Sequence, residues 1–150
     1  MPLALTIYTI AMPNVPSPST HPVRPLSREA ARQLKRLRAV CEGMPECTEK
    51  LSHGTPCFFA DAKAKSGVFA SFDNNHHDAG HIAVWIPAAP GMQEALVEEA
   101  PEIYFRPPYV GAKGWVGIEL ARVSDEALEI HIREAWNMVA AKKKPAKRLL

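Results

Sequence analysis

The sequence predicts a single α+β domain built on a mainly antiparallel β-sheet. Apolar residues recur at three- and four-residue spacing towards both ends of the chain, as in amphipathic helices. The stretch 46–120 between them instead consists of short runs typical of β-strands. The connections between these runs are only a few residues long, which suits antiparallel hairpins and is too short for parallel crossovers.

The length of 150 residues and the hydrophobic content of 47% suit one domain with its own core. We place this domain at residues 25–141. The proline-rich segment 1–24 is expected to be a flexible arm. The lysine-rich segment 142–150 is expected to be a basic tail.

The first helix is expected to start after Ser27, a good N-cap residue. Ala30, Leu34, Leu37 and Cys41 continue its apolar stripe until a Gly-x-Pro sequence stops the pattern. Six strand-like runs follow, bounded by turn-forming residues, at 48–52, 56–59, 68–72, 82–86, 103–105 and 115–120.

A short helix is expected at 91–100, where Pro101 ends it. The last helix is expected to follow Ser124, a second N-cap residue, with acidic residues in its first turn. Its apolar stripe and that of the first helix predict one core. The residues expected in this core are Leu34, Leu37, Phe59, Phe69, Val84, Trp85, Val116, Ile118, Leu128, Ile132 and Trp136.

The net charge of +2 conceals a strong partition along the chain. Residues 24–38 and 142–148 each carry a net charge of +5, whereas residues 39–141 carry −8. On the first helix, Arg28, Arg32, Lys35 and Arg36 fall opposite the apolar stripe. The ordinary interpretation is a solvated helix face, and the alternative is a stripe that contacts phosphates.

The segment 106–117 is predicted to form a surface hairpin with a rigid tip. Two prolines stiffen its approach, and two glycines permit positive φ where the chain reverses. Tyr109 and Trp115 flank Lys113, so this hairpin can present aromatic faces and a cation to a partner. It contains no nucleophile, no acid–base pair and no phosphate-binding loop.

A second group of polar, titratable residues lies at 73–81, which hold three histidines and two aspartates. His76, His77 and His81 are weak candidates for metal ligands. Metal sites use ligands fixed by neighbouring elements, whereas adjacent histidines in a turn-rich loop point in different directions. We therefore expect a polar loop without a bound metal.

Cysteine usage indicates a reducing compartment, because three cysteines cannot all pair and none lies in a Cys-x-x-Cys motif. No apolar run approaches the ~18 residues of a membrane span, so we expect a cytoplasmic protein without a membrane partner. Cys57 lies four residues after His53, but its hydrophobic neighbours indicate a buried thiol. We predict no catalytic residue and no cofactor.

Over about residues 26–141 the chain resembles the MmcQ/YjbR family. The resemblance rests on residues 52–58, on the histidine loop before 82–85, and on a Pro-Pro-Tyr-Val-Gly segment followed by Gly-Trp-Val-Gly. It is similar to the branch with the Pro-Pro-Tyr-Val-Gly hairpin, although Ala112 and Lys113 replace a His-Arg or Arg pair. The resemblance implies a frataxin-like (YjbR-like) arrangement, with N- and C-terminal helices packed on one face of the sheet. Members are commonly labelled DNA-binding.

Two hypotheses for function follow. The leading one is a non-enzymatic nucleic-acid-binding or regulatory module that uses the first helix and the hairpin. The alternative is a small-molecule or protein-interaction domain, with a pocket beside the 106–117 hairpin lined by Tyr104, Tyr109 and Trp115. The candidate binding residues are Arg28, Arg32, Arg36, His53, Arg106, Tyr109, Lys113 and Trp115. The oligomeric state stays open.

Overall fold

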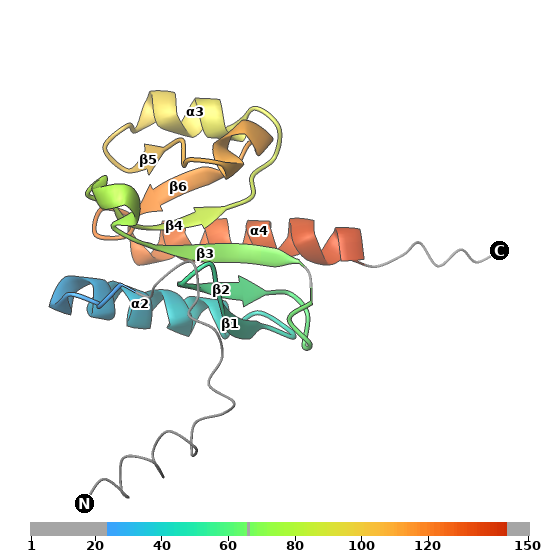
Figure 1. Ribbon diagram of the computed structural model, residues 1–150. Helices are drawn as coiled ribbons and strands as arrows, with labels where there is room; N and C mark the ends of the chain where they lie inside the picture. Colours follow the sequence, from blue (N-terminus) through green and yellow to red (C-terminus); the bar gives the residue numbers. More distant parts are fainter. Residues whose placement is uncertain (1–23, 66, 144–150) are drawn as a thin grey trace, which may run out of the picture.

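A six-stranded antiparallel sheet forms the centre of the molecule. The computed structural model describes residues 24–65 and 67–143 (Figure 1). The strands, in the spatial order β1-β2-β3-β4-β6-β5, are β1 (Thr48–Ser52), β2 (Thr55–Phe59), β3 (Val68–Asn74), β4 (Ile82–Ile86), β5 (Tyr104–Phe105) and β6 (Val116–Glu119). Nearly all of the predicted arm 1–24 and most of the predicted tail 142–150 lie outside the described residues.

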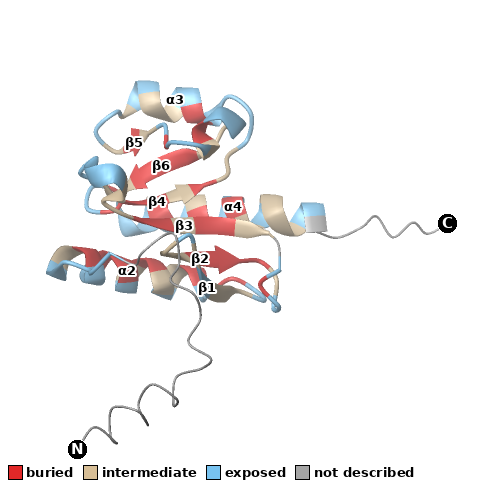
Figure 2. Ribbon diagram, in the orientation of Figure 1, coloured by how far each residue is buried: buried red, intermediate tan, exposed pale blue. Residues whose placement is uncertain are grey.

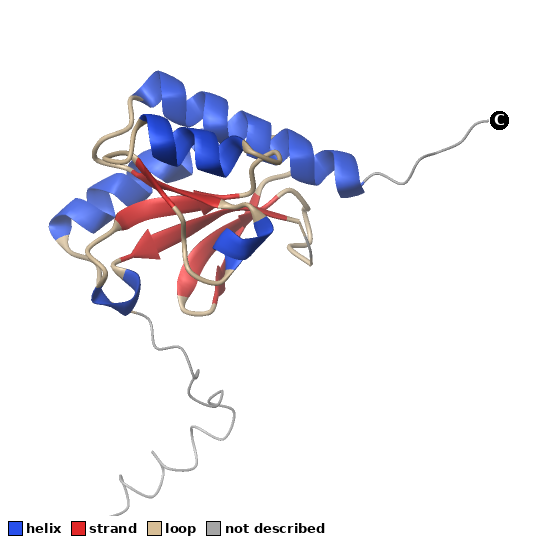
Figure 3. Cartoon of the chain, turned by 90° about the horizontal axis from the view of Figure 1, so that it is seen from above, coloured by secondary structure: helices blue, strands red, loops and turns tan. Residues whose placement is uncertain are grey.

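Two long helices, α2 (Arg28–Cys41) and α4 (Asp125–Lys143), pack against one face of the sheet (Figure 3). We call this the helix face, and the opposite one the open face. Two 3-10 segments, η1 (His76–Asp78) and η2 (Val110–Lys113), and a short helix, α3 (Met92–Glu99), lie in the connections. No helix within the described residues is long and apolar enough to cross a membrane.

The predicted elements are confirmed, with boundaries that differ by one or two residues. Both predicted N-caps act as expected. The Ser27 hydroxyl accepts a hydrogen bond from the amide of Ala30 at 3.0 Å, and the Ser124 hydroxyl accepts one from Ala127 at 3.1 Å. These bonds satisfy amides that the first turn of a helix leaves without partners. Local sequence therefore sets where both long helices begin.

The core fills the space between the two long helices and the sheet (Figure 2). Most of the predicted core residues are buried there. The confirmed ones are Leu34, Leu37, Phe69, Val84, Val116, Ile118, Leu128 and Ile132. Trp136 is only partly buried; it packs against this core and donates its indole N–H to the carbonyl of Pro45 at 3.0 Å.

For Trp85, the prediction of a place in the core is wrong, whereas Phe59 is buried as predicted. Successive residues of a strand point to opposite faces, and Trp85 follows Val84, which faces the helices. Trp85 is therefore partly exposed on the open face. Phe59 is buried in a separate small cluster with Cys57 and Ala64.

The strand register decides which side chains share the open face. Residues directly opposite each other in an antiparallel pair point to the same side. Starting from Trp85, the register therefore places one row across the open face, formed by Lys50, Cys57, Ser71, Trp85, Gly117 and Phe105. Asp73, Ala83 and Glu119 form a second row on the same face.

Candidate functional site

The histidine loop between β3 and β4 has a fixed scaffold. Asn75 and His77 adopt left-handed backbone conformations, with φ of 55° at each. The amide of His76 donates to a carboxylate oxygen of Asp73 at 2.9 Å, and the amide of Gly80 donates to the side-chain oxygen of Asn75 at 2.6 Å. The expectation of an unscaffolded loop is therefore wrong, because aspartate and asparagine side chains hold the turn.

The connection between β5 and β6 carries Tyr109 at its most exposed point. Tyr109 has φ 62° and ψ −70°, and the amide of Val110 donates to the carbonyl of Pro108 at 2.6 Å. This is the geometry of a γ-turn of the rare, strained type. The Tyr109 residue is 70% exposed. Strained backbone of this kind occurs often at functional sites.

These two segments, far apart in sequence, meet over the open face. The Tyr109 hydroxyl and His77 Nε2 form a hydrogen bond of 2.6 Å. The His76 ring lies between its neighbours, with centroid distances of 4.0 Å to His77, 5.5 Å to Trp85 and 5.9 Å to Tyr109. We call His76, His77, Trp85 and Tyr109 the ring surface.

Asp73 lies behind the ring surface and is 3% exposed. One carboxylate oxygen accepts from the His76 amide, and the other accepts from Trp85 Nε1 at 2.9 Å. Burial raises the pKa of Asp73, whereas these hydrogen bonds and the nearby imidazoles of His81 and His76 act in the opposite direction. Burial dominates, so the pKa of this carboxyl lies above its ordinary value.

The three candidate metal-binding histidines do not converge. His81 Nδ1 contacts a carboxylate oxygen of Glu119, and its ring stacks on Phe105 with centroids 3.8 Å apart and planes inclined by 6°. His77 instead contacts Tyr109. The described part of the chain holds no group of three histidine, cysteine, aspartate or glutamate side chains that could bind a metal.

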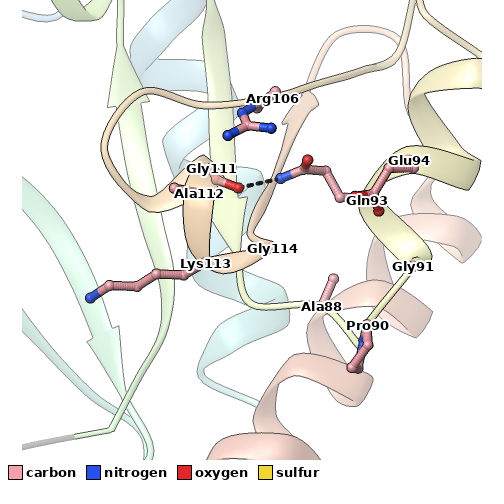
Figure 4. A pocket seen from close by; sticks show the side chains of 10 residues that line it. All are labelled: Ala88, Pro90, Gly91, Gln93, Glu94, Arg106, Gly111, Ala112, Lys113 and Gly114. Atoms are coloured by element: carbon pink, nitrogen blue, oxygen red, sulfur yellow. Dashed lines mark hydrogen bonds between the residues drawn. The ribbon is translucent and has the colours of Figure 1, made fainter.

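A cleft of about 290 Å³ lies between η2 and the start of α3 (Figure 4). The Gln93 amide closes its inner wall by donating to the carbonyl of Gly111 at 2.8 Å and to that of Trp115. Arg106 lies over Gly111, where any Cβ would come within 2.7 Å of its side chain. Glycine is therefore needed at 111 for this position of the arginine. The cleft is lined by Ala88, Pro90, Gly91, Gln93, Glu94, Arg106, Gly111, Ala112, Lys113 and Gly114.

Two cations of this connection are available to a ligand. Arg106 and Lys113 are exposed, and within the described residues neither forms a salt bridge. In Figure 4 the Lys113 side chain points away from the cleft, whereas the Arg106 side chain lies over Gly111. The connection thus carries Tyr109 and two unpaired cations.

The basic helix α2 lies on the helix face, away from the ring surface (Figure 3). Arg28 is exposed, and Arg32 forms a salt bridge with Glu29 at 2.5 Å. Arg36 instead joins α2 to α4: it contacts Asp125 at 2.6 Å and donates to the carbonyl of Val123 at 2.7 Å. The structure therefore does not bring the helix and the 106–117 hairpin together into one basic surface.

His53 occupies the two-residue turn between β1 and β2, where it and Gly54 have φ of 56° and 81°. This type of turn suits the twist of a hairpin. Trp115 is partly buried, so Tyr109 is the more exposed aromatic residue of the hairpin. Tyr104 is buried on the helix face, where its hydroxyl and His131 Nε2 lie 2.7 Å apart. The expected pocket lined jointly by Tyr104, Tyr109 and Trp115 is therefore wrong.

The cysteines provide no activated nucleophile. Burial raises the pKa of all three thiols, to about 11 for Cys47. Cys57 is buried, and its thiol lies 3.4 Å from the hydroxyl of Ser71. A thiol that stays protonated at neutral pH is a poor nucleophile. The prediction that Cys57 is a buried thiol is confirmed.

Sequence reasoning missed Asp73 and Trp85 as parts of a site. From the sequence, Trp85 is expected in the core together with its neighbour Val84, and Asp73 is expected only as a polar residue of the loop. Alternation along β4 was the available signal, because it separates Trp85 from Val84 and Ile86. No local signal shows that Asp73 reaches an indole on the neighbouring strand.

The fold is that of a small α+β protein, in which two helices cover one face of the sheet. The family model that matches the chain is YjbR, over residues 42–138, and the protein belongs to this family. The finer assignment to a Pro-Pro-Tyr-Val-Gly branch stays a prediction.

Among solved structures, the chain is similar to Deinococcus radiodurans protein DR2400, whose title names the domain DUF419. The TM-score is 0.64 and the sequence identity 22%, with 75% of this chain and 82% of that chain covered. This likeness supports the fold: a single α+β domain with N- and C-terminal helices against a six-stranded antiparallel sheet. No curated protein sequence matches the chain.

Proposed function

We propose that this YjbR-family protein is a non-enzymatic module that binds single-stranded nucleic acid through the connection between β5 and β6. The observation that carries the proposal is Tyr109, which is 70% exposed and lies in a strained turn. In sequence it is flanked by Arg106 and Lys113, neither of which forms a salt bridge within the described residues. A base can stack on an exposed aromatic ring, and this contact is worth about 1–3 kcal/mol. Arg106 and Lys113 can contact the adjoining phosphates.

The charges around this connection favour a single strand over a duplex. Glu94 lines the neighbouring cleft, and Glu98, Glu99 and Glu102 are exposed in and just after α3. A duplex presents a long, rigid array of phosphates that would meet these carboxylates. A flexible strand can instead place one or two nucleotides on Tyr109 and its cations. The arginines of α2 are not part of the proposed surface.

The test is binding of a fluorescein-labelled oligothymidylate, followed by anisotropy over a salt series. Tyr109→Ala should lose about 1–3 kcal/mol with an unchanged salt slope. Tyr109→Phe, which keeps the ring, should retain most of the affinity. Lys113→Ala should weaken binding and reduce the salt slope by about 0.7.

Arg32→Ala is the matched control for Lys113→Ala. It also removes one positive charge, but Arg32 lies on α2 at the helix face, away from the proposed binding surface. It should leave both affinity and slope unchanged. If the wild-type protein binds neither single-stranded nor duplex oligonucleotide at low salt, the proposal is wrong.

A second candidate is the binding of a small anion in the cleft of about 290 Å³. It is favoured by the unpaired Arg106 guanidinium in a rigid wall closed by Gln93. Heat-stability screening with small carboxylates and phosphates tests it, since a ligand that binds only the folded state raises the melting temperature. Arg106→Gln should abolish such a shift, whereas Tyr109→Ala should not affect it.

A further inference from the structure

Asp73 is a buried carboxylate whose charged neighbours include the imidazoles of His81 and His76. It is 3% exposed, and among the described residues no lysine or arginine forms a salt bridge with it. Burial of a carboxylate is costly unless hydrogen bonds replace the lost water. The position of Asp73 therefore depends on the groups that donate to it.

These donors belong to two different parts of the ring surface. Oδ1 accepts from the backbone amide of His76 at 2.9 Å, in the turn that also carries His77. Oδ2 accepts from the indole Nε1 of Trp85 at 2.9 Å, on the adjacent strand β4. One carboxylate thus fixes both the rotation of the indole and the start of the histidine turn.

The ring geometry follows from this double contact. The His76 and Trp85 rings meet edge to face, with centroids 5.5 Å apart and planes inclined by 88°. The next residue, His77, then lies within 2.6 Å of the Tyr109 hydroxyl. Loss of the contact to Nε1 would free the indole of Trp85, and loss of the contact to the amide would free the turn that carries the His76 ring.

We propose that Asp73 is the positioning residue of the ring surface. It holds Trp85 and the His76–His77 turn in place before any ligand arrives, so that Tyr109 is presented in one fixed orientation. The inference rests on the proposed function only in taking the ring surface as the place where a base binds. The positioning itself is independent of the ligand.

Asp73→Asn tests this role, because the amide has the same shape but only one acceptor oxygen. Its NH2 group cannot accept from either donor, so one of the two hydrogen bonds must be lost. Asp78→Asn is the matched control. It makes the same chemical change in the same loop, but Asp78 is exposed and paired with Arg24 rather than with the ring surface.

The measurement is the indole N–H resonance of Trp85 in a ¹H–¹⁵N spectrum of the full chain, assigned with Trp85→Phe. Asp73→Asn should shift this resonance and increase its solvent exchange about tenfold or more, while Trp115 and Trp136 stay unchanged. It should also weaken oligothymidylate binding about tenfold, the equivalent of one lost stacking contact. Asp78→Asn should change neither quantity.

An unchanged Trp85 resonance in a folded Asp73→Asn protein would overturn the positioning role. Altered resonance with unaltered oligonucleotide affinity would also overturn it, because the rings would then not need to be held. If the wild type binds no oligonucleotide, the proposed function fails alone, while the indole resonance still tests Asp73.

Should Asp73→Asn fail to fold, the wild-type protein supplies the test. Protonation of Asp73 weakens the carboxylate as an acceptor, so the Trp85 indole resonance should titrate as pH falls through the pKa of this carboxyl. The other titratable groups that act on Asp73 are the imidazoles of His81 and His76. The midpoint should lie above the ordinary aspartate value of 3.8. An indole resonance of Trp85 that does not move while the protein stays folded rejects the inference.

Discussion

The two faces of the sheet are stabilised in different ways. The helix face is a continuous apolar core in which Phe58, Phe72, Leu34 and Ile132 are almost completely buried. The open face instead carries aromatic, histidine and carboxyl side chains that are fixed by hydrogen bonds, above all those to Asp73. Close packing leaves no room for a ligand, whereas hydrogen-bonded rings at a surface stay accessible. The open face is therefore the part of this domain that is suited to binding.

The largest predicted effect on the free energy of unfolding comes from the replacement of a buried leucine, compared with the same replacement of an exposed one. Leu34, on the helix face, is 2% exposed, whereas Leu51 of β1 is 56% exposed. Leu34→Ala should reduce the free energy of unfolding by about 2–5 kcal/mol, because it removes buried methyl groups and leaves a cavity. Leu51→Ala should stay within about 0.5 kcal/mol of the wild type. Denaturant titration of both variants checks this, and equal effects would contradict the assignment of the core.

The open face is tightly packed at Gly117. A Cβ there would lie 2.4 Å from the Phe105 ring. Gly117→Ala should therefore cost about 1–3 kcal/mol through overpacking. In a double-mutant cycle, Phe105→Ala should relieve most of this cost, with a coupling of about 0.5–3 kcal/mol. Additive effects of the two substitutions would mean that the ring does not lie over the glycine.

The two faces should respond to pH in opposite directions. Burial lowers the pKa of His131, which contacts Tyr104 on the helix face. The imidazole of His131 therefore binds a proton more readily in the unfolded chain than in the folded protein. Above the unfolded pKa, near 6.5, this group does not change the free energy of unfolding, and as pH falls below that value it lowers the free energy of unfolding. The melting temperature should fall from pH 8 to pH 5, and His131→Gln should flatten this dependence. A pH profile of His131→Gln identical to that of the wild type would contradict the prediction.

Asp73, on the open face, has the opposite sign because burial raises its pKa. The folded state favours the protonated form of Asp73. This group therefore adds to the free energy of unfolding at pH values below its pKa in the unfolded chain, and that added stability is lost as pH rises through its pKa in the folded protein. When the melting temperature of Asp73→Asn is measured against pH, the loss of stability at rising pH that Asp73 causes should be absent. The loss of stability at falling pH that His131 causes should remain. Identical profiles for Asp73→Asn and wild type would contradict the prediction.

The smallest effect is expected at His77. Its hydrogen bond to Tyr109 joins two exposed side chains, and such bonds contribute little to stability. His77→Ala should change the free energy of unfolding by less than about 0.5 kcal/mol. His76→Ala should cost more, since its ring is partly buried against Trp85. Denaturant titration of the two variants distinguishes them, and the reverse order would contradict the geometry of the ring surface.

The amino-acid sequence by itself determined the secondary structure and most of the core. Ser27 and Ser124 start the long helices because their hydroxyls accept from the first turn, and apolar periodicity indicates which side of each helix is buried. Short turns force antiparallel pairing of neighbouring strands. The strands β5 and β6 also pair antiparallel, although a 3-10 segment rather than a tight tip occupies the connection between them. These features depend on neighbours in sequence, which is why local patterns predict them.

Only the tertiary structure decided the site. The histidine loop and the hairpin were recognised as separate motifs, but their contact through His77 and Tyr109 spans 32 positions of sequence. The basic helix and the hairpin were expected to form one surface, yet the sheet separates them, and Arg36 is used to join α2 to α4. Strand register places Trp85 beside Asp73, and register depends on the pairing of whole strands. A composite site of this kind is therefore invisible in any local segment.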